Sequence, residues 1–358
     1  MGRKSYKALI IVLCCWLASC KKDKPEPANN NLPGATGNVY IACEGNFGNG
    51  DATLYAYDPI HDSVYGDLYK KINGQPLGDV FQSMQRIGGR LFLCINNSDK
   101  IVVIDAVQRK VTGTISIPKP RYILPVSNTK AYVSALYSNR VYVIDPQTLS
   151  VTDTIILPDR NPEGMCLYNS DYAMICTWDT LGNHVYKIDA STNKLVQAIG
   201  LAGYAPQDAL LDKDQMLWVL AGDQYSRRTC TWTRLDPSTG EILKSFTFSA
   251  TVNAVKPVLN NTRDTLYFIE ANQNGGITDN GIYRMGIHDG ALPQQPFVAA
   301  QQHQYFWALG IEQSTGNIYI GDPRGFVQKG IVYIYQPDGT QLKHFDVGLG
   351  PGHFYFDE

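Results

Sequence analysis

The fold is decided by residues 89–117, which read GRLFLCINNSDKIVVIDAVQRKVTGTISI. Residues 91–95 and 101–104 are runs of branched and aromatic side chains, the composition of strands with at least one buried face. Residues 111–117 alternate apolar side chains with Thr and Ser, which is typical of an outer strand with one face in water. The connections at 96–99 and 106–110 have the length of hairpin loops. The stretch is therefore predicted to be a three-strand antiparallel meander.

This meander recurs along most of the chain. Successive copies lie roughly 40 to 50 residues apart, and most are preceded by a further apolar segment that supplies a fourth, inner strand. The seven copies of the first meander strand are residues 39–43, 91–95, 131–136, 172–178, 217–221, 266–271 and 318–321. A four-strand unit with this period is typical of a β-propeller blade. We expect an all-β fold, a single seven-bladed β-propeller over residues 38–358.

The ring is expected to close through its C-terminal strand. The predicted inner strands are residues 83–87, 122–126, 164–168, 209–211, 255–259 and 307–311. The first copy of the meander has no inner strand before it, whereas residues 353–356 at the end of the chain form a strand-like segment. We predict that this segment completes the first blade, since an open array would expose unpaired strand edges.

Residues 1–37 are not expected to belong to the propeller. Basic residues precede an apolar run at 8–17, which is too short to span a bilayer and fits a secretory signal. The run ends Leu17-Ala18-Ser19-Cys20, similar to the lipobox of bacterial lipoproteins, in which the cysteine is acylated. An ordinary cleaved signal with a chance cysteine is the alternative. We predict a lipoprotein signal peptide over residues 1–19, a lipid on Cys20, and a flexible tether over 20–37.

Charge and cysteine content exclude two classes of protein. With 31 basic and 33 acidic residues the formal net charge is −2, a poor fit for binding the nucleic-acid backbone. The cysteines outside residues 1–20 lie within or beside apolar runs, which favours small buried side chains over a disulfide framework. They are Cys43, Cys94, Cys166, Cys176 and Cys230. A bridge between Cys166 and Cys176 is the alternative for that pair.

Repetition separates structural from functional residues. A residue type that recurs in blade after blade is structural, whereas one that occurs once is a functional candidate. An aspartate ends the third strand of five blades, and its side chain is predicted to cap the following turn rather than to bind metal. These residues are Asp58, Asp105, Asp145, Asp189 and Asp236.

The long connections are predicted to share one face. Strand alternation places the second-to-third and outer-to-inner loops together at one end of the ring, opposite the short turns. These loops are residues 44–51, 72–82, 178–184, 222–229, 272–281, 299–306 and 322–330. Their aromatic rings, amides and guanidinium groups fit a broad, partly apolar ligand, although some rings are expected to pack beneath their own loops. The candidate ligand-binding residues are Asn46, Phe47, Phe81, Asn96, Asn97, Tyr122, Tyr137, Trp178, Tyr204, Tyr225, Arg227, Tyr305, Trp307, Arg324 and Phe326, accompanied by Arg228, Asn272 and Gln273.

The sequence offers no catalytic set. The six histidines are dispersed, and no nucleophile-elbow, zinc-protease or Walker motif is present. We expect no catalytic residue, no cofactor and no bound metal. The alternative is an ion-dependent propeller hydrolase or lyase, in which Glu163, Asp208 and Asn96 approach the channel mouth as ligands.

Three motifs resemble a known family. EGNFG at 44–48, PLGDVFQSM at 76–84 and NNSDKI at 96–101 together resemble the YncE-like propeller lipoproteins of Bacteroidota, which include BtuG-type cobalamin-binding proteins. The resemblance implies an outer-membrane lipoprotein facing the cell exterior. It implies that cobalamin or another corrinoid is bound as a ligand and passed to a TonB-dependent transporter. A protein- or glycan-binding surface module is a further alternative.

The lipid attachment is testable at Cys20. Replacing Cys20 with Ala removes the only thiol in the predicted lipobox, so the variant should be released from membranes in cell fractionation. Wild-type protein carried through the same carbonate wash is the control. Unchanged membrane association of the variant would contradict the lipoprotein assignment.

Overall fold

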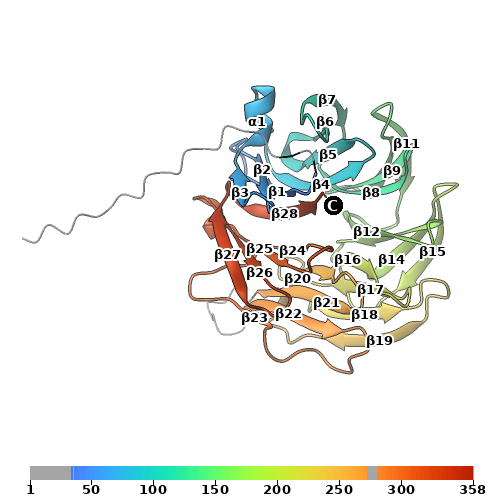
Figure 1. Ribbon diagram of the computed structural model, residues 1–358. Helices are drawn as coiled ribbons and strands as arrows, with labels where there is room; N and C mark the ends of the chain where they lie inside the picture. The colour runs from blue at the N-terminus through green and yellow to red at the C-terminus, as the bar shows by residue number, and fades with distance from the viewer. Residues whose placement is uncertain (1–33, 35, 272–279, 358) are drawn as a thin grey trace, which may run out of the picture.

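The computed structural model describes residues 34, 36–271 and 280–357. The predicted signal peptide, Cys20, most of the tether, and Asn272 and Gln273 with most of their loop lie outside these residues. The described chain forms seven four-stranded antiparallel sheets arranged around a common axis (Figure 1). The predicted seven-bladed β-propeller is confirmed. No helix in the described part of the chain is long and apolar enough to cross a membrane.

Each blade runs from an inner strand at the axis to an outer strand at the rim. In that order, blades one to four are β28 (Pro351–Phe356), β1 (Val39–Cys43), β2 (Thr53–Asp58), β3 (Ser63–Tyr65); β4 (Phe81–Ile87), β5 (Arg90–Ile95), β6 (Lys100–Asp105), β7 (Val111–Ser116); β8 (Pro120–Ser127), β9 (Lys130–Ala135), β10 (Arg140–Asp145), β11 (Ser150–Ile156); β12 (Pro162–Tyr168), β13 (Tyr172–Thr177), β14 (His184–Asp189), β15 (Lys194–Gly200). Blades five to seven are β16 (Pro206–Leu211), β17 (Leu217–Ala221), β18 (Thr231–Leu235), β19 (Ile242–Thr247); β20 (Asn253–Leu259), β21 (Thr265–Ala271), β22 (Gly281–Gly286), β23 (Val298–Ala299); β24 (Ala308–Ile311), β25 (Ile318–Asp322), β26 (Ile331–Tyr335), β27 (Gln341–Asp346).

The core lies between neighbouring blades. Every residue of β1, β17 and β18 is buried, because adjacent blades cover both faces of these strands. A strand covered on both faces has no polar side, and β1 and β17 are accordingly continuous apolar runs. In β18 the buried Arg234 is instead compensated by Asp212 and Asp214. The outer strands β19 and β27 instead alternate exposed and half-buried residues, as a strand with one wet face requires.

The C-terminal strand closes the ring as predicted. β28 pairs antiparallel with β1, and the register joins Val39 to Phe356 and Ile41 to Phe354. Both phenylalanine rings also contact Tyr319 of blade seven, with ring centroids 5.2 and 6.0 Å away. Blade one is therefore held together by the first and last strands of the propeller.

Two local features differ from the sequence-based expectation. The loop expected to begin at residue 72 is preceded by a short helix, α1 (Leu68–Asn73), which Asp67 caps through the backbone N–H of Lys70. Six residues are too few to give a recognisable helical period. The bridge considered between Cys166 and Cys176 is absent: both thiols are free, and the β-ladder pairs Cys166 with Met174.

The recurrent aspartates cap turns, as predicted. Asp105 Oδ1 accepts hydrogen bonds from the backbone N–H groups of Val107 and Gln108, at 2.9 and 2.6 Å. The equivalent bonds are made in the other four blades by Asp58, Asp145, Asp189 and Asp236. These carboxylates are occupied by backbone donors, so their role is structural.

Ring closure is testable by truncation. Deleting residues 351–358 removes β28 with Phe354 and Phe356 and leaves β1 with an unpaired edge, so the free energy of unfolding should fall by at least about 3 kcal/mol. Urea denaturation measures this. Leu342→Ala on the outer strand β27, where the side chain is 47% exposed, is the control and should change stability by less than about 0.5 kcal/mol. A truncated protein as stable as wild type would disprove closure by β28.

Candidate functional site at the channel mouth

The inner strands share an irregularity where they begin. Five of the seven, β4, β8, β12, β16 and β28, carry a register shift near the N-terminal end, and β20 carries one near its middle. A β-bulge leaves a residue unpaired and redirects side chains, and bulges occur preferentially at barrel rims and next to functional sites. The inner strands start on the long-loop face, because each follows an outer-to-inner connection. The five shifts at strand starts therefore gather around the axis on that face, and the shift of β20 lies deeper along the channel.

We call this region the channel mouth. Most residues that form it lie in or beside the shifts, and each blade contributes different chemistry. They are Gln82, Arg121, Tyr122, Glu163, Asp208, Lys256 and His353, with Glu44 and Trp307 from adjoining loops. Residues that recur in every blade are structural, whereas these residues differ from blade to blade. They are therefore functional candidates.

Arg121 and Glu163 form an ion pair at the channel mouth. Arg121 Nε donates to both carboxylate oxygens of Glu163, at 3.0 and 2.8 Å. The same guanidinium donates to Gln82 Oε1, and Gln82 Nε2 lies 3.4 Å from the hydroxyl of Tyr122. Removing one member of a buried pair leaves an uncompensated charge and costs about 3–5 kcal/mol. These four side chains therefore form a rigid, internally neutral wall.

Trp307 is the centre of an aromatic cluster beside this wall. Its indole Nε1 donates to Glu44 Oε1 at 2.7 Å. Tyr305 stacks on it at a centroid distance of 6.2 Å, and Phe326 meets it edge-on at 5.5 Å. The ammonium of Lys256 lies 5.7 Å from the indole centroid. Burial raises the pKa of Glu44, and Lys256 partly opposes that rise.

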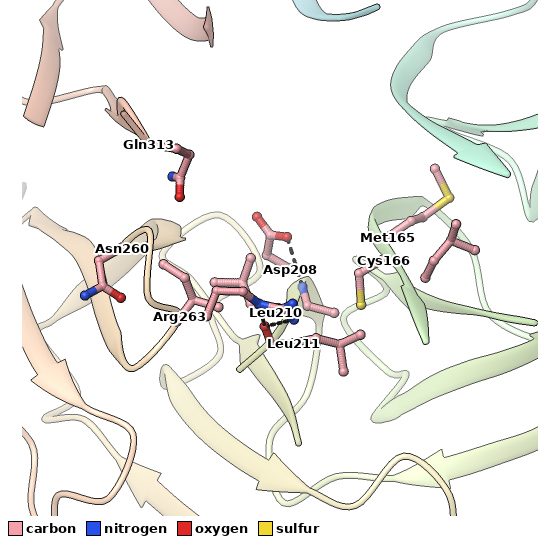
Figure 2. Close-up of a pocket in the computed structure, with 11 residues that line it drawn as sticks. Met165, Cys166, Asp208, Leu210, Leu211, Asn260, Arg263 and Gln313 are labelled. Carbon is pink, nitrogen blue, oxygen red and sulfur yellow. Dashed lines mark hydrogen bonds between the residues drawn. The ribbon is translucent and has the colours of Figure 1, made fainter. Parts of the chain in front are cut away.

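Asp208 lies on the wall of the central cavity. This cavity of about 370 Å³ lies toward the short-turn end of the channel, since it is also lined by Cys166, by Arg263 in the turn after β20 and by Gln313 in the turn after β24 (Figure 2). Asp208 Oδ1 accepts one hydrogen bond, from the backbone N–H of Ala209 at 2.9 Å. Burial raises the pKa of Asp208 to about 7, although Ala209 and Lys256 oppose the rise. Asp208 is therefore a titratable group facing the channel.

A second aromatic cluster lies farther out on the same face. Trp178 and Tyr225 meet edge to face, with centroids 6.4 Å apart. The guanidinium of Arg228 lies 4.7 Å from the ring centroid of Tyr204, and its Nε donates to the carbonyl of Thr180. Two long loops and the connection 201–205 thus converge, and Tyr225 remains 61% exposed. The cluster offers ring surface to a ligand.

The remaining predicted ligand-binding residues are more scattered. Phe47, Tyr137, Arg227 and Arg324 are exposed on separate loops. The position predicted for Phe81 is corrected: its side chain is fully buried and packs between blades one and two. Phe81 is the first residue of β4, and its position in the ladder directs the ring into the core.

The loop amides are largely used within the protein. Asn96 Nδ2 donates to the carbonyl of Pro120 at 3.2 Å, and Asn97 accepts a hydrogen bond from Lys119 at 2.9 Å. At Asn46, the backbone N–H bonds the carboxylate of Asp51 at 2.7 Å. These contacts order the loops.

The alternative metal site finds little support in this geometry. Both carboxylate oxygens of Glu163 accept from Arg121, and the amide of Asn96 is bonded to a backbone carbonyl. Within the described ranges, no three His, Cys, Asp or Glu side chains are placed to hold a metal ion together. Among the described residues, the channel mouth contains one ion pair, Arg121–Glu163, and several aromatic rings.

Only part of the channel mouth was predicted from the sequence. Tyr122 and Trp307 were predicted to bind ligand, and Glu163 and Asp208 were considered only as metal ligands. Five residues were missed: Glu44, Gln82, Arg121, Lys256 and His353. The sequence did contain one signal for where these inner strands start. β8, β12, β16 and β28 all begin at a proline, a residue that sheets tolerate at the first position of a strand. Those prolines mark inner strands that begin earlier than predicted.

Comparison with known proteins agrees with this architecture. Residues 37–357 match the family described as Domain of unknown function (DUF5074). The chain belongs to this family. No protein with a curated description matches the sequence.

Solved structures similar to this DUF5074 propeller share the fold. A quinoprotein alcohol dehydrogenase-like protein from Bacteroides thetaiotaomicron is 17% identical, with a TM-score of 0.67 over 92% of this chain and 80% of the other. A protein from Lactobacillus plantarum is 12% identical, with a TM-score of 0.63 over 90% and 100%. Streptogramin B lyase is 13% identical, with a TM-score of 0.52 over 75% and 82%. Identities this low show the fold alone.

The raised pKa of Asp208 makes stability depend on pH. The folded protein keeps a proton on Asp208 up to about pH 7, whereas the unfolded chain loses it near pH 4. The stability of the wild type relative to Asp208→Asn should therefore fall by about 2–3 kcal/mol between pH 5 and pH 8. Urea denaturation of both proteins across this range measures the difference. A constant difference would show that Asp208 titrates normally.

Proposed function

We propose that this protein is a surface lipoprotein that binds cobalamin or another corrinoid on its long-loop face and passes it to a TonB-dependent transporter. The observation that carries the proposal is the cluster around Trp307, where a stacked ring, an edge-on ring and the carboxylate of Glu44 meet. A corrinoid is broad, flattened and fringed with amide groups. It needs ring surface and hydrogen-bonding groups together.

The two aromatic clusters support a ligand of this breadth. Trp307 and its neighbours lie at the channel mouth, and the Trp178–Tyr225 pair lies farther out on the loops of blades four and five. In each cluster the rings are held against one another before any ligand arrives. Binding then immobilises few side chains, so little conformational entropy is lost.

Binding without chemical conversion is favoured over hydrolysis or elimination. Glu163, the most obvious acid at the channel mouth, is neutralised by Arg121, which suits a rigid wall better than proton transfer. A structural neighbour is a streptogramin lyase, but one fold serves many functions. Trp307, Tyr305 and Phe326 present ring surface suited to recognition.

The entry of the chain into the propeller supports presentation of this face away from the membrane. β1 begins at Val39 on the short-turn face, where Gly37 N–H donates to the carbonyl of Asp357 at 2.8 Å. The Arg109 guanidinium donates to the carbonyl of Gly34. A tether from Cys20 would reach the propeller on the face opposite the long loops, leaving those loops free.

The proposal is testable at Trp307. Trp307→Ala removes the central ring, so cyanocobalamin should bind the soluble domain more weakly by about 1–3 kcal/mol in isothermal titration calorimetry. Thr239→Ala, in a short turn on the opposite face, is the control and should bind like wild type. No binding by the wild-type domain would reject the corrinoid proposal, and equal losses from both variants would reject the assigned face.

A further inference from the structure

The loops of blades three to five form a second surface on the long-loop face, which we call the outer strip. Its side chains come from five connections between strands, and all but the half-buried Arg228 are exposed. They are Tyr137, Arg160, Leu181, Tyr204, Tyr225 and Arg228. Tyrosine and arginine together suit recognition, because one offers a ring face and the other a planar set of N–H donors.

Hydrogen bonds join these loops into one surface. Arg160 Nη2 donates to the carbonyl of Tyr137 at 3.1 Å, and the backbone N–H of Arg160 donates to the Asp179 carboxylate at 3.0 Å. On the other side, Arg228 Nε donates to the carbonyl of Thr180 at 2.8 Å. The loop of blade four that contains Asp179 and Thr180 therefore lies between the two arginines. Blades three, four and five all contribute to the strip.

The guanidinium groups of the strip have no carboxylate partner. Arg160 and Arg228 are each held by a backbone carbonyl, and the Arg228 guanidinium also lies 4.7 Å from the ring centroid of Tyr204. Neither these two residues nor the exposed Arg227 beside them forms a salt bridge with a residue that the structure describes. Their remaining N–H groups can receive an anion, and a planar guanidinium matches the two oxygens of a carboxylate.

The carboxylates of the same loops are used by donors within the protein. Asp179 accepts two backbone N–H groups, each at 3.0 Å. Asp159 accepts from the hydroxyl of Tyr186 at 2.6 Å. Asp223 is buried and accepts a backbone N–H at 2.6 Å. An anion that approaches the strip therefore meets unpaired guanidinium donors, whereas the acids are already hydrogen-bonded.

Apolar surface lies among these arginines. The side chains of Tyr137 and Leu181 are 68% and 78% exposed. The backbone N–H of Tyr137 donates to Asn161 Oδ1 at 2.8 Å, and the Tyr225 ring is held edge to face against Trp178. The loops that carry these side chains are ordered before any ligand arrives, so binding loses little conformational entropy.

Rings and guanidinium groups on one strip fit a chain that repeats an apolar ring face and a carboxylate. A uronic acid residue has both, since its pyranose ring carries C–H groups on its faces and one carboxylate at its edge. A neutral sugar would leave the guanidinium groups unused, and a small anion would leave the tyrosine rings unused. Because the strip crosses three blades, several linked uronic acid residues can bind along it.

We propose that the outer strip binds an acidic polysaccharide built from uronic acid residues, with sugar faces on Tyr137 and Tyr225 and carboxylates on Arg160 and Arg228. The site lies outside the Trp307 cluster. It goes beyond the proposed function and does not rest on it, although both use the ring of Tyr225.

The test measures binding of polygalacturonate by the purified protein with biolayer interferometry. Arg160→Gln and Arg228→Gln should each weaken binding roughly fivefold, the effect of losing an exposed charge-assisted contact, and the double variant should lose more. Lys329→Gln is the matched control, because it removes an exposed positive charge from the same face outside the strip, and it should bind like wild type. Thermal unfolding verifies that each variant is folded. Unchanged binding by the double variant would overturn the proposal.

Two further polymers identify which part of the ligand is recognised. The methyl ester of polygalacturonate keeps the sugar rings without the charge, and poly-L-glutamate keeps the carboxylates without the rings. Each should bind at least roughly tenfold more weakly than polygalacturonate, whose own binding should weaken with added salt. Equal binding of polyglutamate would overturn the proposal in favour of an acidic protein partner, and equal binding of the methyl ester would overturn the role of the arginines.

Failure of this site and failure of the proposed function are distinguishable in one preparation. No binding of polygalacturonate by wild type, with cyanocobalamin still bound, would overturn the polysaccharide site and leave the corrinoid proposal standing. Binding of polygalacturonate without cyanocobalamin would support the polysaccharide site alone.

Discussion

The pairing of β1 with β28 is the interaction on which the rest of the structure depends. It joins the two ends of the propeller in one sheet and removes the free edge that a linear array of blades would leave. The same closure assembles the site: Glu44 N–H bonds the carbonyl of Gly350 at 2.8 Å, and the Glu44 carboxylate accepts from Trp307 of blade seven. The contacts that close the ring therefore also position Trp307, because Glu44 takes part in both.

The repeated scaffold of the propeller holds chemistry that does not repeat. The turn-capping aspartates recur because every blade must make the same turn, and backbone donors occupy them. The register shifts of the inner strands also recur, yet they carry Gln82, Arg121 and Glu163 at the starts of three strands and Lys256 in the middle of β20. Each bulge redirects one side chain toward the axis, so a symmetric fold builds an asymmetric site.

Charge compensation divides the channel mouth into two parts. Arg121 and Glu163 compensate each other, whereas no salt bridge within the described residues involves Lys256 or Asp208. Burial acts on the second part by raising the pKa of Asp208, because a charge costs more where water is excluded. The aromatic clusters add apolar surface around these groups. The polar groups and the aromatic clusters together form a preorganised face suited to recognition.

The sequence by itself determined the seven blades, the closure by the last strand and the capping role of the aspartates. These features depend on local period and on turn chemistry, which a single repeat already displays. The burial of Phe81 and the assembly of the channel mouth depend on the tertiary structure. The inner strands begin before the apolar runs that predict them, at residues such as Pro120 and Pro162, where proline and charged side chains do not indicate a strand. Only the ring brings these starts together, because residues far apart in the chain meet at its axis.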